Sequence, residues 1–320
     1  VHFQFSPSWS GFVRVRAFVP TGTVLVNGNE NDNVAATDKA FLGLQEAWVD
    51  YGGFTDYPGE SIRFGRQRIR EDDAEYWDQD VDAVRWIFDT TLLQAQAAVG
   101  REFSTYRTDD VGLPPEQAHR TYLFGVLSRE WRAYQRIGVR ALYATDENSN
   151  LPPVGSAVGP ESKLLTGDRG WIGVYADNHY FDGRNTPQSW SYDVSLSWLT
   201  GHQNIATVDP VTQTVSGVNS GKVNAWAAEG GLRYRFPSER FPLQLGAAYV
   251  YSGGARAGSV SDQFTQTGLQ SNYSRFTGTD SLIERFTDAY RVELGNLRAS
   301  TVYASVNMNR WDASVIVSRY

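Results

Sequence analysis

The sequence contains no cysteine, carries no net positive charge and has no long apolar run. Without cysteine, the 320-residue chain has neither disulfides nor thiolate metal ligands. Its formal net charge of −7 argues against a general nucleic-acid binder. No segment approaches the ~18 consecutive apolar residues that a membrane-spanning helix needs. This excludes a helical membrane protein but not a β-barrel, whose strands are only half apolar.

Aromatic residues are abundant, at 13% of the chain, and apolar and polar residues alternate along most of it. The run FVRVRAFV at 12–19 would place three valines and an alanine on one face of a strand. Arg14 and Arg16 would then lie on the other face, with two phenylalanines. A soluble sandwich would bury the valines, whereas a membrane barrel would turn them to lipid. We favour the barrel and expect both arginines to face its lumen, because an arginine facing lipid at mid-depth costs ~2–4 kcal/mol.

The same alternation predicts about fourteen strands of roughly the length expected for a barrel. They cover residues 1–5, 9–19, 41–51, 61–69, 83–89, 93–99, 120–131, 136–144, 170–177, 190–199, 225–236, 243–251, 298–308 and 312–320. Gly65 interrupts one of them, and we expect it to mark a β-bulge.

The expected connections alternate between short and long. The short ones are 6–8, 52–60, 90–92, 132–135, 178–189, 237–242 and 309–311, and the long ones are 20–40, 70–82, 104–119, 145–165, 200–222 and 252–297. This alternation is typical of an up-and-down barrel with short periplasmic turns and long outer loops. Aromatic residues near the strand ends suit the two membrane interfaces. We therefore predict an all-β, antiparallel, outer-membrane β-barrel that forms one domain over residues 1–320. A large sandwich or a propeller is the soluble alternative.

Several motifs resemble one family. They are WVDYGG (48–53), YPGE (57–60), FGRQRIRED (64–72), DTTLLQA (89–95), YRTD (106–109), RIGVR (136–140), WLTG (198–201), FTQTGLQSN (264–272) and RFTGT (275–279). In these runs, and in their order, the chain resembles the bacterial alginate exporters of the outer membrane. The resemblance implies an eighteen-stranded monomeric barrel with an arginine-rich constriction that passes polyanionic alginate.

Set against that family, the chain is short. The resemblance implies that one strand is missing before Val1 and about three after Tyr320, together with the long periplasmic loop that covers the family's pore. An open sheet in lipid would leave unpaired edges, so we expect a trimmed chain, incomplete at both ends.

The resemblance also implies that the constriction is altered. Arg68 stands where the family has a pore arginine, but Gln4, Gln45 and Leu282 replace three others. In exchange, Arg14, Arg16, Arg85 and Arg235 stand at inward positions where a family member has uncharged residues. The substrate therefore stays open between alginate, another acidic polymer and an acylated neutral glucan.

Nine arginines are candidates for an electropositive lumen: Arg14, Arg16, Arg63, Arg66, Arg68, Arg85, Arg140, Arg233 and Arg235. Guanidinium suits this role because its fork of donors matches a carboxylate and its charge does not titrate. The alternative is that they pair with inward acids and fill the lumen. Glu46 and Asp50 are the acids we add to the pore-lining set, and Asp89, Asp193 and Glu229 are further candidate partners.

An acidic run, REDDAEYWDQDVD at 70–82, falls in an expected loop. Asp78, Asp80 and Asp82 have the spacing of calcium ligands, but Ala83 stands where the glycine of a calcium loop belongs. We prefer a solvated outer loop near lipopolysaccharide, and we expect no metal.

The sequence favours passive export of an anionic exopolysaccharide as the function. No cluster of a nucleophile with a base is apparent, so we expect neither an enzyme nor a cofactor. The alternatives are an exporter of a neutral or acetylated glucan, an anion-selective porin for small acids, and an outer-membrane hydrolase. The expected partners are the polysaccharide, outer-membrane lipid with lipopolysaccharide, and periplasmic proteins of an export complex, but no nucleic acid.

Overall fold

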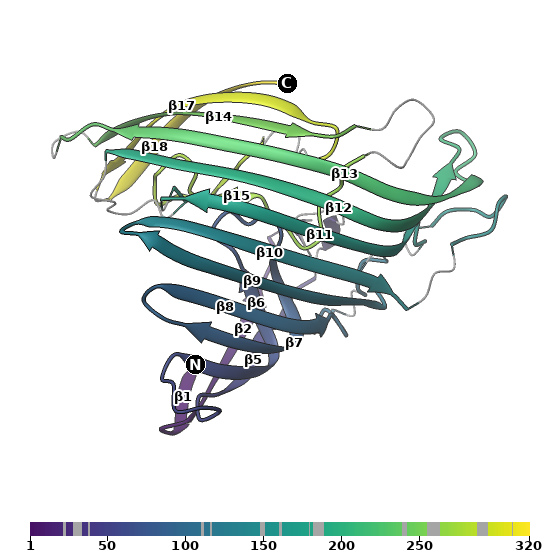
Figure 1. Ribbon diagram of the computed structural model, residues 1–320. Helices are drawn as coiled ribbons and strands as arrows, with labels where there is room; N and C mark the ends of the chain where they lie inside the picture. Colours follow the sequence, from purple (N-terminus) through teal and green to yellow (C-terminus); the bar gives the residue numbers. More distant parts are fainter. Residues whose placement is uncertain are drawn as a thin grey trace.

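A single large sheet dominates the computed structural model. The model describes residues 1–320 apart from 22–23, 28–33, 38, 110–111, 116, 148–150, 160–161, 179, 182–188, 239–241, 255–262, 287–293 and 309. Fourteen strands form one antiparallel sheet in which each strand pairs with the next in sequence, and the sheet curves around a concave face (Figure 1). In the described part of the chain, no helix is long and apolar enough to cross a membrane.

The fourteen predicted strands are all present, in the predicted order. In sheet order they are β1 (His2–Ser6), β2 (Trp9–Phe18), β5 (Phe41–Tyr51), β6 (Glu60–Arg70), β7 (Asp78–Asp89), β8 (Leu93–Arg101), β9 (Arg120–Arg132), β10 (Gln135–Asp146), β11 (Leu165–Asp177), β12 (Trp190–Val208), β13 (Val215–Arg235), β14 (Leu243–Ser252), β17 (Arg298–Met308) and β18 (Trp311–Arg319). Two short hairpins were not expected: β3 (Val24–Asn27) with β4 (Val34–Thr37), and β15 (Tyr273–Ser274) with β16 (Ile283–Glu284).

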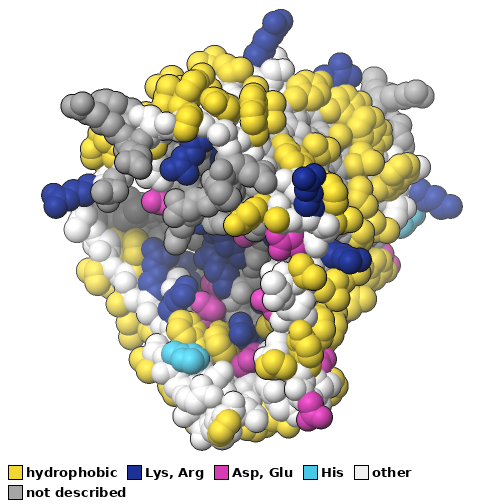
Figure 2. All heavy atoms as spheres, turned by 60° about the vertical axis from the view of Figure 1, so that its left-hand side comes forward, with side chains coloured by type: hydrophobic (Ala, Val, Ile, Leu, Met, Phe, Trp, Pro, Cys, Tyr) yellow, Lys and Arg dark blue, Asp and Glu magenta, His cyan; other side chains and the backbone are white. Residues whose placement is uncertain are grey.

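Exposure alternates along the strands as a membrane barrel requires. On β12, Val194 and Leu196 are exposed, whereas Asp193, Ser195 and Ser197 are buried on the concave side. On β13, Leu232 is exposed on the outer surface. Figure 2 shows hydrophobic side chains spread over the outer surface, and a hollow where arginine or lysine side chains gather beside acids. The apolar face therefore lies outside and the polar face inside, which confirms the up-and-down outer-membrane barrel.

One expected loop is instead a pair of long strands. The sequence predicts a loop over 200–222, but β12 continues to Val208 and β13 begins at Val215, so that only 209–214 connects them. The prediction was wrong because this part of the hairpin carries polar residues on both faces, with His202 and Lys222 on one face and Gln203 on the other. A hairpin that extends beyond the membrane into water shows no apolar alternation. Parts of the expected loops 20–40, 145–165 and 252–297 lie outside the described residues.

Beyond Arg66 and Asp82, the β6–β7 hairpin leaves the large sheet, which forms the wall of the barrel, and bends over the concave face. Pairing between β5 and β6 covers only 47–51 with 62–66. Nearer the start of β5, Leu44 N donates to Tyr106 O (3.0 Å), so the connection after β8 lies beside β5 there in place of β6. Gly65, at the point of departure, has φ +113°, and a Cβ there would lie 2.3 Å from Ala47 O. Because β6 and β7 stay paired through Gly65, it marks a bend rather than the expected bulge.

Two segments fill the concave face. The tip of the β6–β7 hairpin, residues 71–77, carries Trp77 against Phe124 of β9, with ring centroids 5.2 Å apart. The second segment is 263–286, between β14 and β17, where Trp171 Nε1 donates to Thr265 O at 2.8 Å. The acidic run is thus not the solvated loop that we expected. Only 71–77 is a connection, and Glu75, Tyr76 and Trp77 are buried.

The outer surface yields a stability prediction. Val194 of β12 lies midway between the outward-facing Trp190 and Trp198, and its exposure is 56%. Val194→Arg should lower the free energy of unfolding by about 2–4 kcal/mol, because it places a charge against hydrocarbon. The measurement is urea unfolding from lipid vesicles. Val211→Arg, in the turn 209–214, is the control, and equal losses in the two variants would contradict a lipid-facing Val194.

Candidate functional site

A first cluster of charges joins the wall to the bent hairpin. Arg14 of β2 pairs with Glu46 of β5 at 3.0 Å, and the same carboxylate accepts a hydrogen bond from Arg68 N at 3.3 Å. Because Glu46 points to the concave side, this contact places β6 in front of β5. The side chains of Arg14 and Arg68 remain 49% and 41% exposed, so both guanidinium groups are accessible.

The three aspartates of β7 face the arginines of β6. Arg68 and Arg70 share Asp78, at 2.6 and 2.9 Å, and Ser271 Oγ also donates to Asp78 at 2.6 Å. Asp82 pairs with Arg66 at 3.4 Å, and Asp80 lies opposite Arg68 in the ladder. Arg66 is buried, with its guanidinium 4.8 Å from the centre of the Tyr106 ring. The aspartates thus alternate along an extended strand, each opposite a cation, rather than converging as calcium ligands do.

A second cluster, on β5–β8, has an excess of positive charge. Arg63 and Arg85 are direct cross-strand neighbours, and like charges in that position repel. Asp50 accepts a hydrogen bond from Arg63 Nε at 3.1 Å, and the Arg63 guanidinium stacks 3.8 Å from the Trp48 ring centre. Arg85 donates to the neutral Gln96, and among the described residues its buried Nε has no hydrogen-bond partner. One carboxylate therefore serves two guanidinium groups, which leaves a place for an added anion.

A third cluster surrounds Arg140 of β10. Its guanidinium, 2% exposed, donates to Asp73 at 2.6 Å, to Glu71 at 3.1 Å and to Glu75. It also lies 4.1 Å from the centre of the Tyr76 ring. Arg140 therefore holds the hairpin tip 71–77 on the wall and is not a free pore contact.

Burial controls the charge of this tip. Burial raises the pKa of Glu71 to about 8, and it raises the pKa of Glu75 well above its usual range despite Arg140. Burial acts on Asp73 in the same direction, but Arg140 and Arg285 outweigh it and lower its pKa. Burial therefore favours the protonated forms of Glu71 and Glu75, whereas the two arginines favour the ionised form of Asp73.

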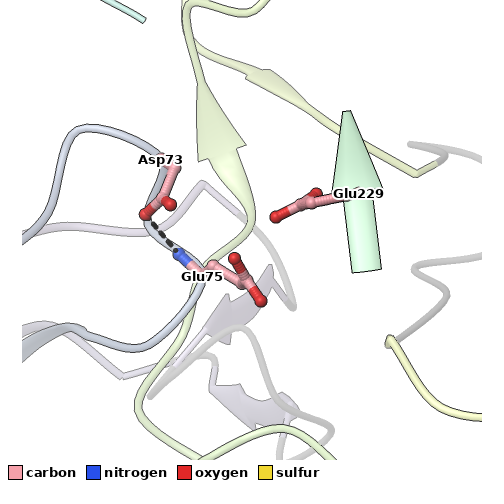
Figure 3. Close-up of side chains that lie close together, drawn as sticks. All are labelled: Asp73, Glu75 and Glu229. Atoms are coloured by element: carbon pink, nitrogen blue, oxygen red, sulfur yellow. Dashed lines mark hydrogen bonds between the residues drawn. The ribbon is translucent and has the colours of Figure 1, made fainter. Parts of the chain in front are cut away.

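Asp73 and Glu75 approach Glu229 of β13, and one carboxylate oxygen from each of the three lies within 4.8 Å of the other two (Figure 3). Arg285 pairs with Glu229 at 2.6 Å and lies 3.8 Å from Asp193 of β12. Since Arg140 and Arg285 already supply positive charge here, the group is an ion-pair network that joins both inward segments to the wall.

The remaining predicted arginines are spread along the concave face. Arg233 is 4% exposed and donates to Phe276 O at 3.1 Å, so it anchors segment 263–286. Arg235 is half-buried and follows Arg233 on the same face of β13. Arg16 is exposed, with its guanidinium 5.6 Å from the Phe18 ring centre.

A cavity of about 250 Å³ lies beside the hairpin tip. Its lining includes Arg85, Gln96, Asp72, Arg136, Arg140 and Asp177. Arg136 of β10 pairs with Asp177 at 3.0 Å and with Asp72 of the tip at 3.2 Å. Sequence reasoning missed Arg136, although it stands four residues before Arg140 and therefore on the same face of a strand. It also missed Arg70, although its partner Asp78 lies opposite it in the same hairpin. Arg285 was missed because its partners Asp193 and Glu229 lie in strands that no local pattern connects to it.

The anchoring of segment 263–286 can be tested through Arg285. Arg285→Gln leaves Asp193 and Glu229 without this cation, and removing one partner of a buried pair costs about 3–5 kcal/mol. We expect the segment to detach while the sheet stays folded, so that chymotrypsin cleaves faster at Phe276, as read by mass spectrometry. Arg298→Gln, at an exposed position, is the control. Identical cleavage rates in the two variants would show that Arg285 does not anchor the segment.

Comparison with known proteins gives consistent relatives. The alginate export family model matches residues 4–320. The chain is 38% identical over 326 residues to the alginate production protein AlgE of Pseudomonas aeruginosa, with 98% of this chain and 65% of that protein covered. It is 36% identical to AlgE of Pseudomonas syringae pv. tomato, with 98% and 64% covered, and 36% identical to AlgE of Azotobacter vinelandii, with 87% and 55% covered. The chain thus spans 65% or less of the length of these relatives.

Among solved structures, the chain is similar to a loop L8 deletion mutant of OmpT, an outer membrane protein of Vibrio cholerae. The TM-score is 0.47 at 10% sequence identity, with 99% of this chain and 83% of the other covered.

Proposed function

Because the chain belongs to the alginate export family, we propose that it forms a channel for an anionic exopolysaccharide such as alginate, with inward arginines as contacts for the polymer. The chain lies in the bacterial outer membrane, with its apolar face toward lipid. Transport rather than catalysis is the activity that we assign to it.

The observation that carries the proposal is the set of accessible guanidinium groups on the lumen side. Arg14 and Arg68 each have a carboxylate partner yet keep nearly half of the side chain exposed. Glu46 and Asp78 are themselves buried, so they stay in place, and carboxylates of a passing polymer can bind to the exposed side of each guanidinium group. Contacts of this kind at exposed charges are worth only ~0–1 kcal/mol. Arg63 and Arg85 share one carboxylate and so carry an excess of positive charge, which offers the polymer a further contact.

Conduction favours this division between weak and strong ion pairs. A channel needs attraction at several weak sites, because one tight site would stall the polymer. The exposed arginines supply weak sites, whereas Arg140 and Arg233 are buried and serve the internal architecture. A neutral glucan would gain little from guanidinium groups, so the arrangement favours an acidic polymer.

Arg68 allows a direct test of the conduit. Arg68→Ala should leave the barrel folded, because Asp78 keeps its pairs with Arg70 and Ser271. Loss of one exposed contact of about 1 kcal/mol should lower polymer secretion about two- to fivefold. Arg68→Glu should lower it by about tenfold, since the new charge repels the polymer. The measurement is secreted uronic acid, with heat-modified gel mobility to report folding.

The matched control is Arg132→Glu, which makes the same charge change at an exposed position beside the turn 133–134. Its secretion should equal that of the unmodified protein. If Arg68→Glu folds and secretes normally, Arg68 is not part of the conduit.

A further inference from the structure

The hairpin tip carries four acids within five residues: Glu71, Asp72, Asp73 and Glu75. All four contact two arginines on the inner face of β10. Arg140 binds Glu71, Asp73 and Glu75, and Arg136 binds Asp72. The tip is therefore a short polymer with a carboxylate on nearly every unit, bound along a row of guanidinium groups. An acidic polysaccharide has the same chemistry.

The arginines that hold the tip border the cavity of about 250 Å³. Arg136 and Arg140 both line it, as do Asp72 and Asp73. An anion in this cavity would thus meet the same two guanidinium groups that the tip binds, and the tip would compete with it.

The charges around the cavity show what the tip changes. Apart from the tip, the described residues pair Arg136 with Asp177, and Arg285 with Asp193 and Glu229. Among the same residues, Arg140 has its carboxylate partners in the tip alone. The seated tip adds acids to this balanced wall. A seated tip therefore repels a polyanion, and a displaced tip leaves Arg140 and Arg136 open to one.

We propose that residues 71–75 act as an internal pseudosubstrate, which occupies a carboxylate-binding site at Arg136 and Arg140 until an acidic polysaccharide displaces it. This inference rests on the proposed function, and it assigns to that function a binding site and a resting state. Asp72 and Asp73 are the acids of the tip that the first variant below removes, since Asp72 pairs with Arg136 and Asp73 pairs with Arg140.

Gly173 of β11 gives an independent way to displace the tip. A Cβ at this position would lie 2.7 Å from the Tyr76 hydroxyl oxygen and 3.0 Å from Arg140 Nε. Gly173→Val would therefore remove the space that the tip occupies while keeping all of its charges. Valine also suits a strand better than glycine does, so we expect the wall to tolerate the change.

The experiment compares the full-length protein with Asp72→Asn/Asp73→Asn and with Gly173→Val in planar bilayers. The probes are potassium chloride current and block of that current by a galacturonate hexamer or by a neutral cello-oligomer of equal length. We expect both variants to carry more current, and the double variant to shift toward chloride permeation. The hexamer should block each variant at a concentration roughly tenfold lower than the unmodified protein needs. Block by the neutral oligomer should not change.

The matched control is Glu147→Gln/Asp209→Asn, which removes two acids from outer connections that do not line the cavity. It should behave as the unmodified protein does. The proposal fails if both variants match the unmodified protein in current and in hexamer block, and failure of one variant to fold leaves the other to decide. Failure of the proposed function would look different: the tip variants would conduct and bind the hexamer, yet cells with the unmodified protein would secrete no acidic polymer.

Discussion

The free-energy cost of placing a charged side chain against lipid governs this structure. The cost is about 2–4 kcal/mol for an arginine at the bilayer midplane, and it directs the charges of the strands to the concave face. There the charges need partners, and some partners lie in neighbouring strands, whereas those of Arg140 and Arg285 come from segments distant in sequence. Arg140 of β10 binds the hairpin tip 71–77, and Arg285 binds Asp193 and Glu229 of the wall. The pairs that neutralise the lumen thus also hold both inward segments in place.

Inward arginines consequently differ in what they can do. Arg140 and Arg233 are buried and bound to internal segments, so their interactions hold these segments on the sheet rather than contact a polymer. Arg14 and Arg68 keep exposed guanidinium groups, and Arg85 has a buried Nε without a hydrogen-bond partner among the described residues. Uneven pairing explains how a chain with a net charge of −7 can still offer local sites for anions.

Strand order and the choice of lipid-facing residues could be predicted because both follow from alternation along one segment, as at Val194 and Leu232. The ends of β12 and β13 could not, since a hairpin in water needs no apolar face. The position of 71–77 was also missed: acids in a solvated loop and acids bound to a buried arginine look alike in sequence. Their difference lies in Arg140, more than sixty residues away.

The most direct test of the account is a structure of the full-length protein in lipid with an oligouronate bound. The account predicts electron density for the sugar carboxylates at the guanidinium groups of Arg14 and Arg68 in the lumen. It also predicts that residues 71–75 leave Arg136 and Arg140. An oligouronate bound outside the lumen, or bound inside it without contact to any of these arginines, would contradict the account.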